Sequence, residues 1–490
     1  MKETVTPLED DVHNWRGFQG QQLYPFQETC IRFAREANGR VLLNLDVGAG
    51  KTPISLACTK LLAGQTHPVL IITKAKLKVQ WMKQIYKWLG EFSYILDKVD
   101  TPLLPVKYYI MSYEVTRKWA DSLVLRQLGI RTLILDECQH IRNIDSKRSV
   151  SVKKIAAKVE KVIGLSAHPI KNRFSEYYPT LHCIQPTRFP SFAQFARDWC
   201  YSSSNKYGIA VGGCRDIEAF FNETRDFIIR FTKEEVLPDL PKVQRDFQYY
   251  DLSAEVEEAY FRLEEELSDY MENTEDKGSA KTSHILAFLV KMRHLTGLSK
   301  VEPTVEEASE FILSCDRKLT IFVHHQLVAE MIIASLNGYL RDGGFPECLH
   351  LKGGMSDEDL ANLLNDFEHG PYRVMVASTL ASGEGLDLQF CSDAIFVERQ
   401  WNSVNEEQAE GRFERIGQKA NKILVKYMIA LGTIDEWLTE LVEEKRKIVH
   451  STLTGVEVED ESNVINQLAE MIVQKRNGRK WNLRKKFYGK

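Results

Sequence analysis

The sequence lacks the features that mark several classes of protein. Its nine cysteines form no Cys-x-x-Cys pair, which argues against a zinc site or a disulfide framework. No apolar run approaches the roughly 18–20 residues that span a bilayer, and the first residues contain no apolar signal region, so no membrane partner is expected. The formal net charge is only −4, so any nucleic-acid-binding surface must be local. A reducing compartment, the cytoplasm or the nucleus, is expected.

The remaining composition is ordinary for a globular protein. The chain has 490 residues, of which 43% are hydrophobic and 27% charged. This length predicts two to four domains.

A glycine-rich stretch is the first feature that carries chemistry. Residues 45–52 read Leu-Asp-Val-Gly-Ala-Gly-Lys-Thr, between an apolar strand at 41–45 and a helix with Pro53 in its first turn. Strand, glycine loop and helix N-terminus form the context of a phosphate-binding loop, in which Lys51 reaches the β/γ phosphates and Thr52 holds Mg²⁺. The alternative is a tight strand-to-helix turn in a redox or sugar enzyme. The nucleotide-binding candidates are Asp46, Val47, Gly48, Ala49, Gly50, Lys51 and Thr52.

An acidic pair supplies the second half of a nucleotide-hydrolysing site. The apolar strand 132–135 ends at Asp136 and Glu137. Asp136 is expected to hold Mg²⁺ through water, and Glu137 to polarise the attacking water. An acidic turn after a strand is the alternative. Upstream, the side-chain amide of Gln27 can hydrogen-bond an adenine edge, but on these residues alone an ordinary surface glutamine is the default interpretation.

Apolar strands alternating with helical segments predict an α/β fold with two parallel sheets in tandem. The second sheet, within residues 305–445, has no phosphate loop of its own. The predicted strands are 41–45, 69–72, 108–111, 132–135 and 161–165 in the first sheet, and 319–323, 348–351, 374–377 and 394–397 in the second.

The order of these motifs resembles helicase superfamily 2, and within it the Swi/Snf branch of double-stranded-DNA translocases. The family has Gly-x-Gly-Lys-Thr at the loop, Asp-Glu-x-His in the second motif and Leu-Thr-Gly-Thr-Pro-x-x-Asn in the third. Here the third motif, residues 165–172, reads Leu-Ser-Ala-His-Pro-Ile-Lys-Asn, with Ala167-His168 in place of Gly-Thr. In the second motif, His140 stands one place late.

Residues 401–418 carry the most specific part of the resemblance. The family motif is Trp-Asn-Pro, four residues, then Gln-Ala-x-x-Arg-x-x-Arg-Ile-Gly-Gln, and every fixed position matches except Ser403. The i, i+4, i+7 spacing of Gln408, Arg412 and Arg415 predicts that they share one helix face. Spacing alone favours salt-bridged surface arginines, whereas the resemblance implies arginine fingers for a triphosphate.

The resemblance implies two RecA-like domains that sandwich ATP–Mg²⁺ and work as a monomer on DNA. Gln27 would contact adenine, Thr52 and Asp136 would hold Mg²⁺, and Gly385, Asp387 and Gln408 would add nucleotide contacts. The implied catalytic residues are Lys51, Asp136, Glu137, Arg412 and Arg415. Contacts to DNA phosphates, independent of base sequence, are expected from Lys74, Lys76, Ser112, Gly353, Ser378, Thr379 and Trp401.

The expected domain order is an ATP-binding RecA-like domain (1–235, with an insertion at about 186–235), a helical linker or brace (236–304), a C-terminal RecA-like helicase domain (305–450) and a helical basic tail (451–490). The last residues are basic and aromatic, which suits either a nucleic-acid surface or a solubilising tail.

The inserts around 195–221 and 292–297 resemble the annealing-helicase, fork-remodelling subgroup, and the short chain resembles phage or bacterial members. The resulting hypothesis is an ATP-dependent DNA translocase or helicase that remodels branched DNA, by branch migration, fork regression or annealing, in replication, recombination or repair. The alternatives are a Swi/Snf-type remodeller that displaces proteins from DNA, and an ATP-gated DNA-binding scaffold with little turnover.

Overall fold

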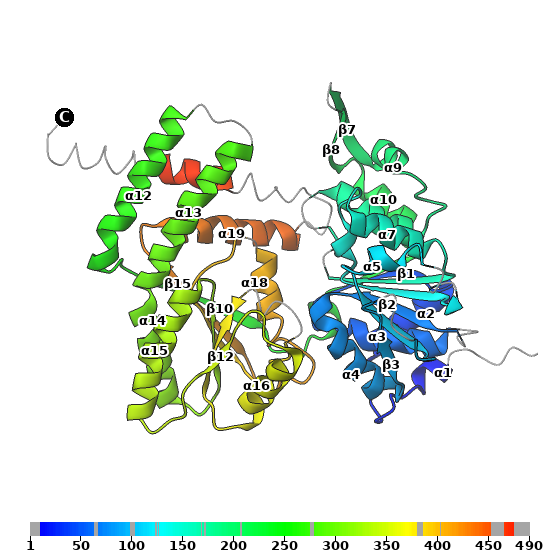
Figure 1. The fold of residues 1–490 in the computed structure, drawn as a ribbon, viewed down its shortest axis with the longest axis horizontal. Coiled ribbons are helices and arrows are strands. Elements are labelled where there is room, and N and C mark those ends of the chain that lie inside the picture. The colour runs from blue at the N-terminus through cyan, green and yellow to red at the C-terminus, as the bar shows by residue number, and fades with distance from the viewer. Residues whose placement is uncertain are drawn as a thin grey trace, which may run out of the picture. The chain divides into compact units, whose positions relative to one another are not determined.

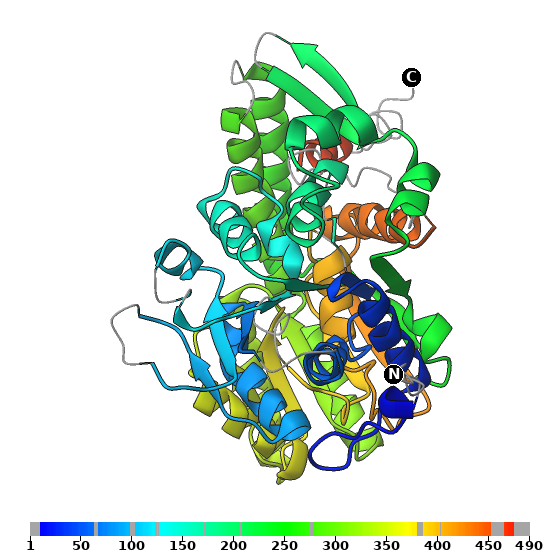
Figure 2. The same cartoon turned by 90° about the vertical axis from the view of Figure 1, so that its right-hand side faces the viewer.

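The structure, a computed structural model, divides into two compact units between Asp239 and Leu240. Figures 1 and 2 show the course of the chain through both units. The described residues are 10–62, 67–98, 103–122, 125, 127–167, 169–170, 173–205, 208–274, 279–379, 386–401, 403–451 and 465–474. No helix among them is long and apolar enough to cross a membrane.

The first unit contains a parallel sheet in which seven described strands have the order β3-β4-β2-β5-β6-β1-β9. The five predicted strands are all present and form its centre, and β3 and β9 extend it at the two edges. The strands are β1 (Arg40–Leu45), β2 (Val69–Thr73), β3 (Ser93–Ile95), β4 (Tyr108–Ser112), β5 (Thr132–Asp136), β6 (Lys161–Ser166) and β9 (Ile228–Phe231).

Helices lie between most successive strands of the first unit, as the crossover connections of a parallel sheet require. An antiparallel hairpin, β7 (Cys200–Asn205) with β8 (Gly208–Cys214), projects from this unit (Figures 1 and 2). The helices are α1 (Asp10–His13), α2 (Pro25–Glu36), α3 (Lys51–Leu61), α4 (Lys78–Leu89), α5 (Thr116–Trp119), α7 (Lys147–Ala156), α8 (Tyr178–Ile184), α9 (Phe192–Trp199), α10 (Ile217–Thr224) and α11 (Lys233–Val236), with 3₁₀ turns at Ala75–Leu77, Cys138–Ile141 and Phe174–Tyr177.

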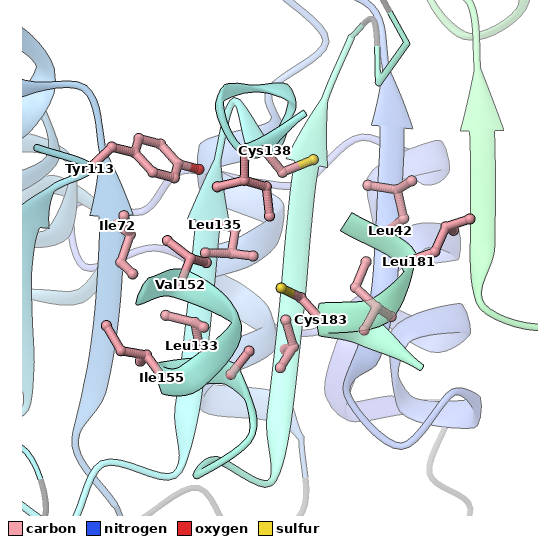
Figure 3. Close-up of a cluster of buried hydrophobic side chains, with 14 of the residues drawn as sticks. Leu42, Ile72, Tyr113, Leu133, Leu135, Cys138, Val152, Ile155, Leu181 and Cys183 are labelled. Atoms are coloured by element: carbon pink, nitrogen blue, oxygen red, sulfur yellow. The ribbon is translucent and has the colours of Figure 1, made fainter. Parts of the chain in front are cut away.

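One hydrophobic core covers a face of this sheet. Leu133 and Leu135 alternate along β5 and therefore point to the same face, where Val152 and Ile155 of α7 pack on them (Figure 3). All four side chains are at most 3% exposed. The core therefore fixes β5, and with it the acidic pair at its carboxyl end, beside β6.

The second unit contains another parallel sheet, whose six described strands have the order β10-β15-β14-β11-β13-β12. The four predicted strands are present, and β10 and β15 were not predicted. The strands are β10 (Val243–Tyr250), β11 (Leu319–Val323), β12 (Leu349–Leu351), β13 (Val374–Ser378), β14 (Asp393–Phe396) and β15 (Ile423–Ala430).

Long helices accompany this second sheet. Two of them, α12 and α13, were predicted within 253–298, and they pack with α19 and with helical residues 465–474 around a separate apolar cluster that includes Tyr260, Leu289, Leu438 and Leu468. The helices are α12 (Ala254–Asn273), α13 (Ser279–Ser299), α14 (Val301–Ser314), α15 (Gln326–Asp342), α16 (Asp357–His369), α18 (Ser403–Glu410) and α19 (Ile434–Ser451).

Candidate functional site

The glycine loop has the backbone geometry that the motif predicts. Gly48 and Gly50 have φ angles of 90° and 79°, in the left-handed region that disfavours other residues. A Cβ atom on Gly50 would lie 2.3 Å from Nε2 of Gln27, so a side chain there would require the Gln27 amide to move. The loop leads directly into the N-terminus of α3, where backbone N–H groups and the helix dipole favour an anion. This chain's residues therefore fit a nucleotide phosphate.

Lys51, the first residue of α3, lies along the same loop. Its Nζ donates hydrogen bonds to the carbonyl oxygens of Leu45 at 2.8 Å and Asp46 at 3.1 Å. The carboxylate of Asp46 accepts a 2.9 Å hydrogen bond from the backbone N–H of Lys233, which ties the loop to α11. The ammonium group is thus kept at the phosphate-binding turn.

Gln27 contacts the loop and is not an ordinary surface glutamine. It is 2% exposed, its Nε2 donates to the carbonyl of Ala49 at 3.3 Å, and its Oε1 accepts from the backbone N–H of Tyr24 at 3.0 Å. The amide therefore links the start of α2 to the phosphate loop. An adenine contact by Gln27 stays a prediction.

Asp136 is buried and held by two donors that the sequence analysis did not single out. Its Oδ2 accepts from the hydroxyl of Thr73 at 2.7 Å and from Nε1 of Trp81 at 2.8 Å. Burial and the neighbouring charge of Glu137 raise the pKa of Asp136, while these two hydrogen bonds act to lower it. Thr73 and Trp81 flank the Lys74–Lys76 stretch in the sequence, but no sequence pattern joins either of them to Asp136.

Gln139 connects the acidic pair to the third motif. Glu137 has a φ of 50°, unusual for a residue other than glycine. Its carboxylate accepts from Nε2 of Gln139, whose Oε1 accepts a 2.7 Å hydrogen bond from the hydroxyl of Ser166 at the end of β6. His140, the residue one place late, instead stacks on Tyr113 with ring centroids 5.5 Å apart. Gln139 thus makes the link between the two motifs.

The DNA-contact candidates of the first unit gather at one sheet edge. The register pairs Thr73 with Ser112, so Lys74 follows β2 beside the end of β4. Lys76 is exposed, whereas Ser112 is only 2% exposed. Their contacts with DNA remain predictions.

The expectation that Gln408, Arg412 and Arg415 share one helix face is wrong. Helix α18 ends at Glu410, and both arginines lie in the turns that follow it. Backbone N–H groups of Arg412 and Phe413 donate three residues back, to Ala409 at 3.1 Å and Glu410 at 3.0 Å, in place of the α-helical four. These turns bring the ring of Phe413 into the core, where it is fully buried, and that burial outweighs continuation of the helix.

Two of the predicted nucleotide-site residues meet in the second unit. The Arg415 guanidinium forms an ion pair with the carboxylate of Asp387, and its Nε donates to the carbonyl of Gly411 at 3.1 Å. Arg412 is 9% exposed, and its carbonyl accepts from the N–H of Leu388 at 3.2 Å. The turn that carries both arginines is therefore joined to the segment around Asp387 and Leu388.

The remaining candidates of the second unit differ in exposure. Gly353 is exposed, Ser378 ends β13, and Thr379 is 1% exposed. Trp401 is half-buried, and its ring lies over the Arg293 guanidinium, 4.5 Å from the ring centroid. Gln408 is half-buried on α18. Gly385, three residues of the third motif (His168, Lys171 and Asn172) and the basic residues of 475–490 lie outside the described residues.

Two curated proteins are similar to this chain over most of its length. The human "DNA annealing helicase and endonuclease ZRANB3" is 26% identical over 89% of the chain, which spans 40% of that protein. A Caenorhabditis elegans "SWI/SNF-related matrix-associated actin-dependent regulator of chromatin subfamily A-like protein 1 homolog" is 29% identical over 88% of the chain, which spans 61% of it. The chain thus spans about half the length of these curated relatives.

Among solved structures, the helicase domain of Hef from Pyrococcus furiosus matches with a TM-score of 0.52. It is 14% identical and the match covers 86% of this chain and 98% of that one, which supports the predicted two-sheet fold.

Two family models match the chain in succession. The SNF2-related domain matches residues 26–297, more than half of the 490, and the helicase conserved C-terminal domain matches residues 305–417. Both agree with the predicted enzyme class, a DNA-dependent ATPase of the helicase type. The chain belongs to the SNF2-related family.

Proposed function

We propose that this chain is a DNA-dependent ATPase that translocates on double-stranded DNA and remodels branched DNA by branch migration, fork regression or annealing. One observation supports the ATPase part of this proposal: the phosphate loop and the acidic pair each lie at the carboxyl end of a strand, and both strands belong to the same sheet. β1 and β5 are the two neighbours of β6, so Lys51 and Asp136 lie at the same edge. A chain that merely used a tight turn would have no need of the acidic pair.

Each site residue has a definite part in this proposal. Lys51 and the loop N–H groups bind the phosphates, and Thr52 and Asp136 hold Mg²⁺, which supplies charge neutralisation of the transferring phosphoryl group. Glu137 orients the attacking water. Gln139, which bonds both Glu137 and Ser166, is the group through which a change at the third motif reaches the water.

The second unit supplies the remaining charges. We propose that Arg412 and Arg415 act as arginine fingers, with Asp387, Gln408 and Gly385 beside them. The support for this is the residue-by-residue match of 401–418 to the family motif and the helicase C-terminal match, which includes this stretch. A finger that leaves and returns with each ATP would make closure of the site the step that moves DNA.

The DNA is proposed to be held through its phosphates. Lys74, Lys76 and Ser112 in the first unit, and Gly353, Ser378, Thr379 and Trp401 in the second, are the proposed contacts, and the chain is proposed to act as a monomer. Phosphate contacts predict binding without base specificity and with a strong dependence on salt.

The branched-DNA part of the proposal draws on the similarity to a protein named as an annealing helicase. The relatives named as SWI/SNF-related regulators of chromatin favour the second candidate, a remodeller that displaces proteins from DNA.

Incubation with ATP and labelled forks, Holliday junctions and blunt duplex separates the two functions. Conversion of the junctions, with blunt duplex left intact, is expected. Displacement of a bound protein from linear duplex, with junctions unchanged, would instead support the remodeller. Lys51→Ala is the control for both assays, because activity that survives it does not come from this site.

A further inference from the structure

Helix α18 presents a buried acidic face toward the interior of the second unit. The side chain of Glu406 is fully buried, that of Glu410 is 3% exposed and that of Glu407 is 14% exposed. The positions i, i+1 and i+4 place all three carboxylates toward the interior of the second unit. Buried carboxylates are tolerated when they are paired and hydrogen-bonded.

The carboxylate of Glu406, in the first turn of the helix, is paired with Arg399. Nε and Nη2 of Arg399 donate to the two oxygens of Glu406 at 2.9 and 2.7 Å, and neither side chain is exposed. The backbone N–H of Gln400 adds a third bond to Glu406, at 2.8 Å. Such a two-pronged pair fixes the orientation as well as the distance of the helix.

A second arginine reaches the same carboxylate from α19. Nη2 of Arg446 donates to Glu406 at 3.1 Å, and its Nη1 donates to Glu443 at 3.0 Å. Its Nε lies 3.3 Å from Glu407. The Arg446 side chain is only 4% exposed, so a residue far along the chain is buried against the start of α18.

The carboxylate at the end of the helix has its own anchors. Glu410 accepts bonds of 2.7 and 2.6 Å from Arg245 of β10 and one of 2.8 Å from the hydroxyl of Tyr427 of β15. Burial acts to raise the pKa of Glu410, but these partners outweigh it and the pKa is lowered. Burial raises the pKa of Glu407 to about 7, although the nearby Arg446 guanidinium acts to lower it. The helix is therefore tied at both ends to three elements of the second unit.

The turn with the proposed arginine fingers begins where these anchors end. The N–H of Gly411 donates to the carbonyl of Glu407 at 2.8 Å, and that of Phe413 donates to Glu410 at 3.0 Å. An isolated helix of eight residues is not stable in water, so α18 depends on its tertiary contacts for its form. If one of the arginines paired with the acidic face is removed, the hydrogen bonds at the start of this turn are expected to weaken.

We propose that Arg446 is a positioning residue, which together with Arg399 holds helix α18 in place. The turn that follows α18 then presents Arg412 to the nucleotide. Through this contact, helix α19 controls the rate of ATP hydrolysis. This inference rests on the proposed function. It predicts that a change in α19 alters turnover without altering the capture of ATP, because the phosphate loop belongs to the other unit.

The first test compares Arg446→Met with Arg262→Met. Arg262 is also ion-paired, with Glu258 at 2.8 Å, but it is exposed on α12 and serves as the matched control. In Arg446→Met, kcat of DNA-stimulated ATP hydrolysis is expected to fall about 10- to 100-fold, as for other small misplacements of a reacting group, with KM for ATP within about twofold of wild type. The control keeps both constants. A rise in KM for ATP with kcat intact would overturn the inference.

Arg412→Ala shows whether Arg446 acts through the turn. The double variant Arg446→Met, Arg412→Ala is expected to lose less kcat than the product of the two single losses, since one of the two fingers that Arg446 would position is already absent. Multiplied losses would mean that Arg446 acts independently of Arg412, against the inference. Arg446→Lys, which keeps the charge but not the fork of donors, is expected to recover part of kcat.

Hydrogen exchange gives a readout that does not depend on activity. The amides of Gly411 and Phe413 are expected to exchange faster in Arg446→Met, and at the wild-type rate in Arg262→Met. Glu406→Gln, which removes the charge and replaces one acceptor oxygen by an NH2 group facing the arginine donors, serves if Arg446→Met does not fold. Unchanged exchange in a folded variant would refute the positioning role. If the wild type shows no DNA-stimulated ATPase, the proposed function fails, and exchange still decides whether Arg446 holds the turn.

Discussion

Trp81 should determine how well the first unit binds Mg²⁺. Its indole Nε1 donates a 2.8 Å hydrogen bond to Oδ2 of Asp136, and the ring is 3% exposed. Trp81→Phe keeps an aromatic ring in the space and removes the donor. Among the residues that the structure describes, the hydroxyl of Thr73 is then the one remaining donor to that oxygen.

The size of the effect follows from the charge on the acceptor. A hydrogen bond to an ionised group contributes about 1.5–3 kcal/mol, more than one between neutral groups. If that bond orients the carboxylate toward Mg²⁺, its loss raises the Mg²⁺ concentration for half-maximal ATPase by at most about 10- to 100-fold, since about 1.4 kcal/mol is a factor of ten. High Mg²⁺ is expected to restore turnover.

Trp119→Phe is the matched control. Trp119 is fully buried in the same unit, and its Nε1 has no hydrogen-bond partner among the described residues. ATPase rates are measured against Mg²⁺ at fixed ATP for wild type and both variants. An unchanged Mg²⁺ midpoint in Trp81→Phe, or an equal shift in Trp119→Phe, would refute the reasoning.

Three further changes test other contacts. Gly50→Ala should raise KM for ATP and lower the midpoint of thermal unfolding, because φ is positive there and the new Cβ meets a side-chain amide at 2.3 Å. Gln139→Ala should lower the stimulation of ATPase by DNA more than it lowers the basal rate, because it breaks the bond to Ser166 as well as the bond to Glu137. Glu398→Gln should lower the free energy of unfolding at pH 7 by up to about 3 kcal/mol, because burial acts to raise the pKa of Glu398 but its bonds with His325 lower it from 4.5 to about 2. A lowered carboxyl pKa stabilises the fold above pH 4.5, so this difference should disappear as the pH falls toward 2, as denaturant unfolding will show.

Each change has an outcome that counts against it. Gly129 also has a positive φ, but a Cβ atom there would meet nothing within 4 Å. If the unfolding midpoint falls equally in Gly50→Ala and Gly129→Ala, the contact between the new Cβ and Gln27 does not contribute to the loss of stability. If DNA stimulates the ATPase of Gln139→Ala as strongly as that of the wild type, the bond between the second and third motifs is not needed for the stimulation. A Glu398→Gln deficit that is constant with pH would mean that the charge does not stabilise the fold.

The five central strands of the first sheet and the inner strands β11, β13 and β14 of the second could be predicted because they are largely apolar, whereas the inner strand β15 was missed although it too is mostly apolar. Strands buried on both faces, such as Val69–Thr73, leave a continuous hydrophobic run in the sequence. The edge strand β10 was missed because Val243–Tyr250 contains Gln, Arg and Asp and none of its residues is fully buried. Short β3 and β9 leave no signal beyond three or four residues.

The site was predictable where a motif fixes the backbone, and not where a distant side chain completes it. The glycines at 48 and 50 indicate a tight turn from the sequence alone. The spacing of Arg412 and Arg415 suggested a continuous helix, but burial of Phe413 ends it at Glu410. Nothing in the sequence places Trp81 on Asp136, since that contact joins residues 55 positions apart.

The central claim is that ATP hydrolysis at the Lys51 loop depends on DNA. The most direct test measures the steady-state ATPase rate of wild type and Lys51→Ala with and without duplex DNA. The rate should rise on addition of DNA in the wild type and be lost in Lys51→Ala under both conditions. A rate that DNA does not change, or one that survives Lys51→Ala, would contradict the account.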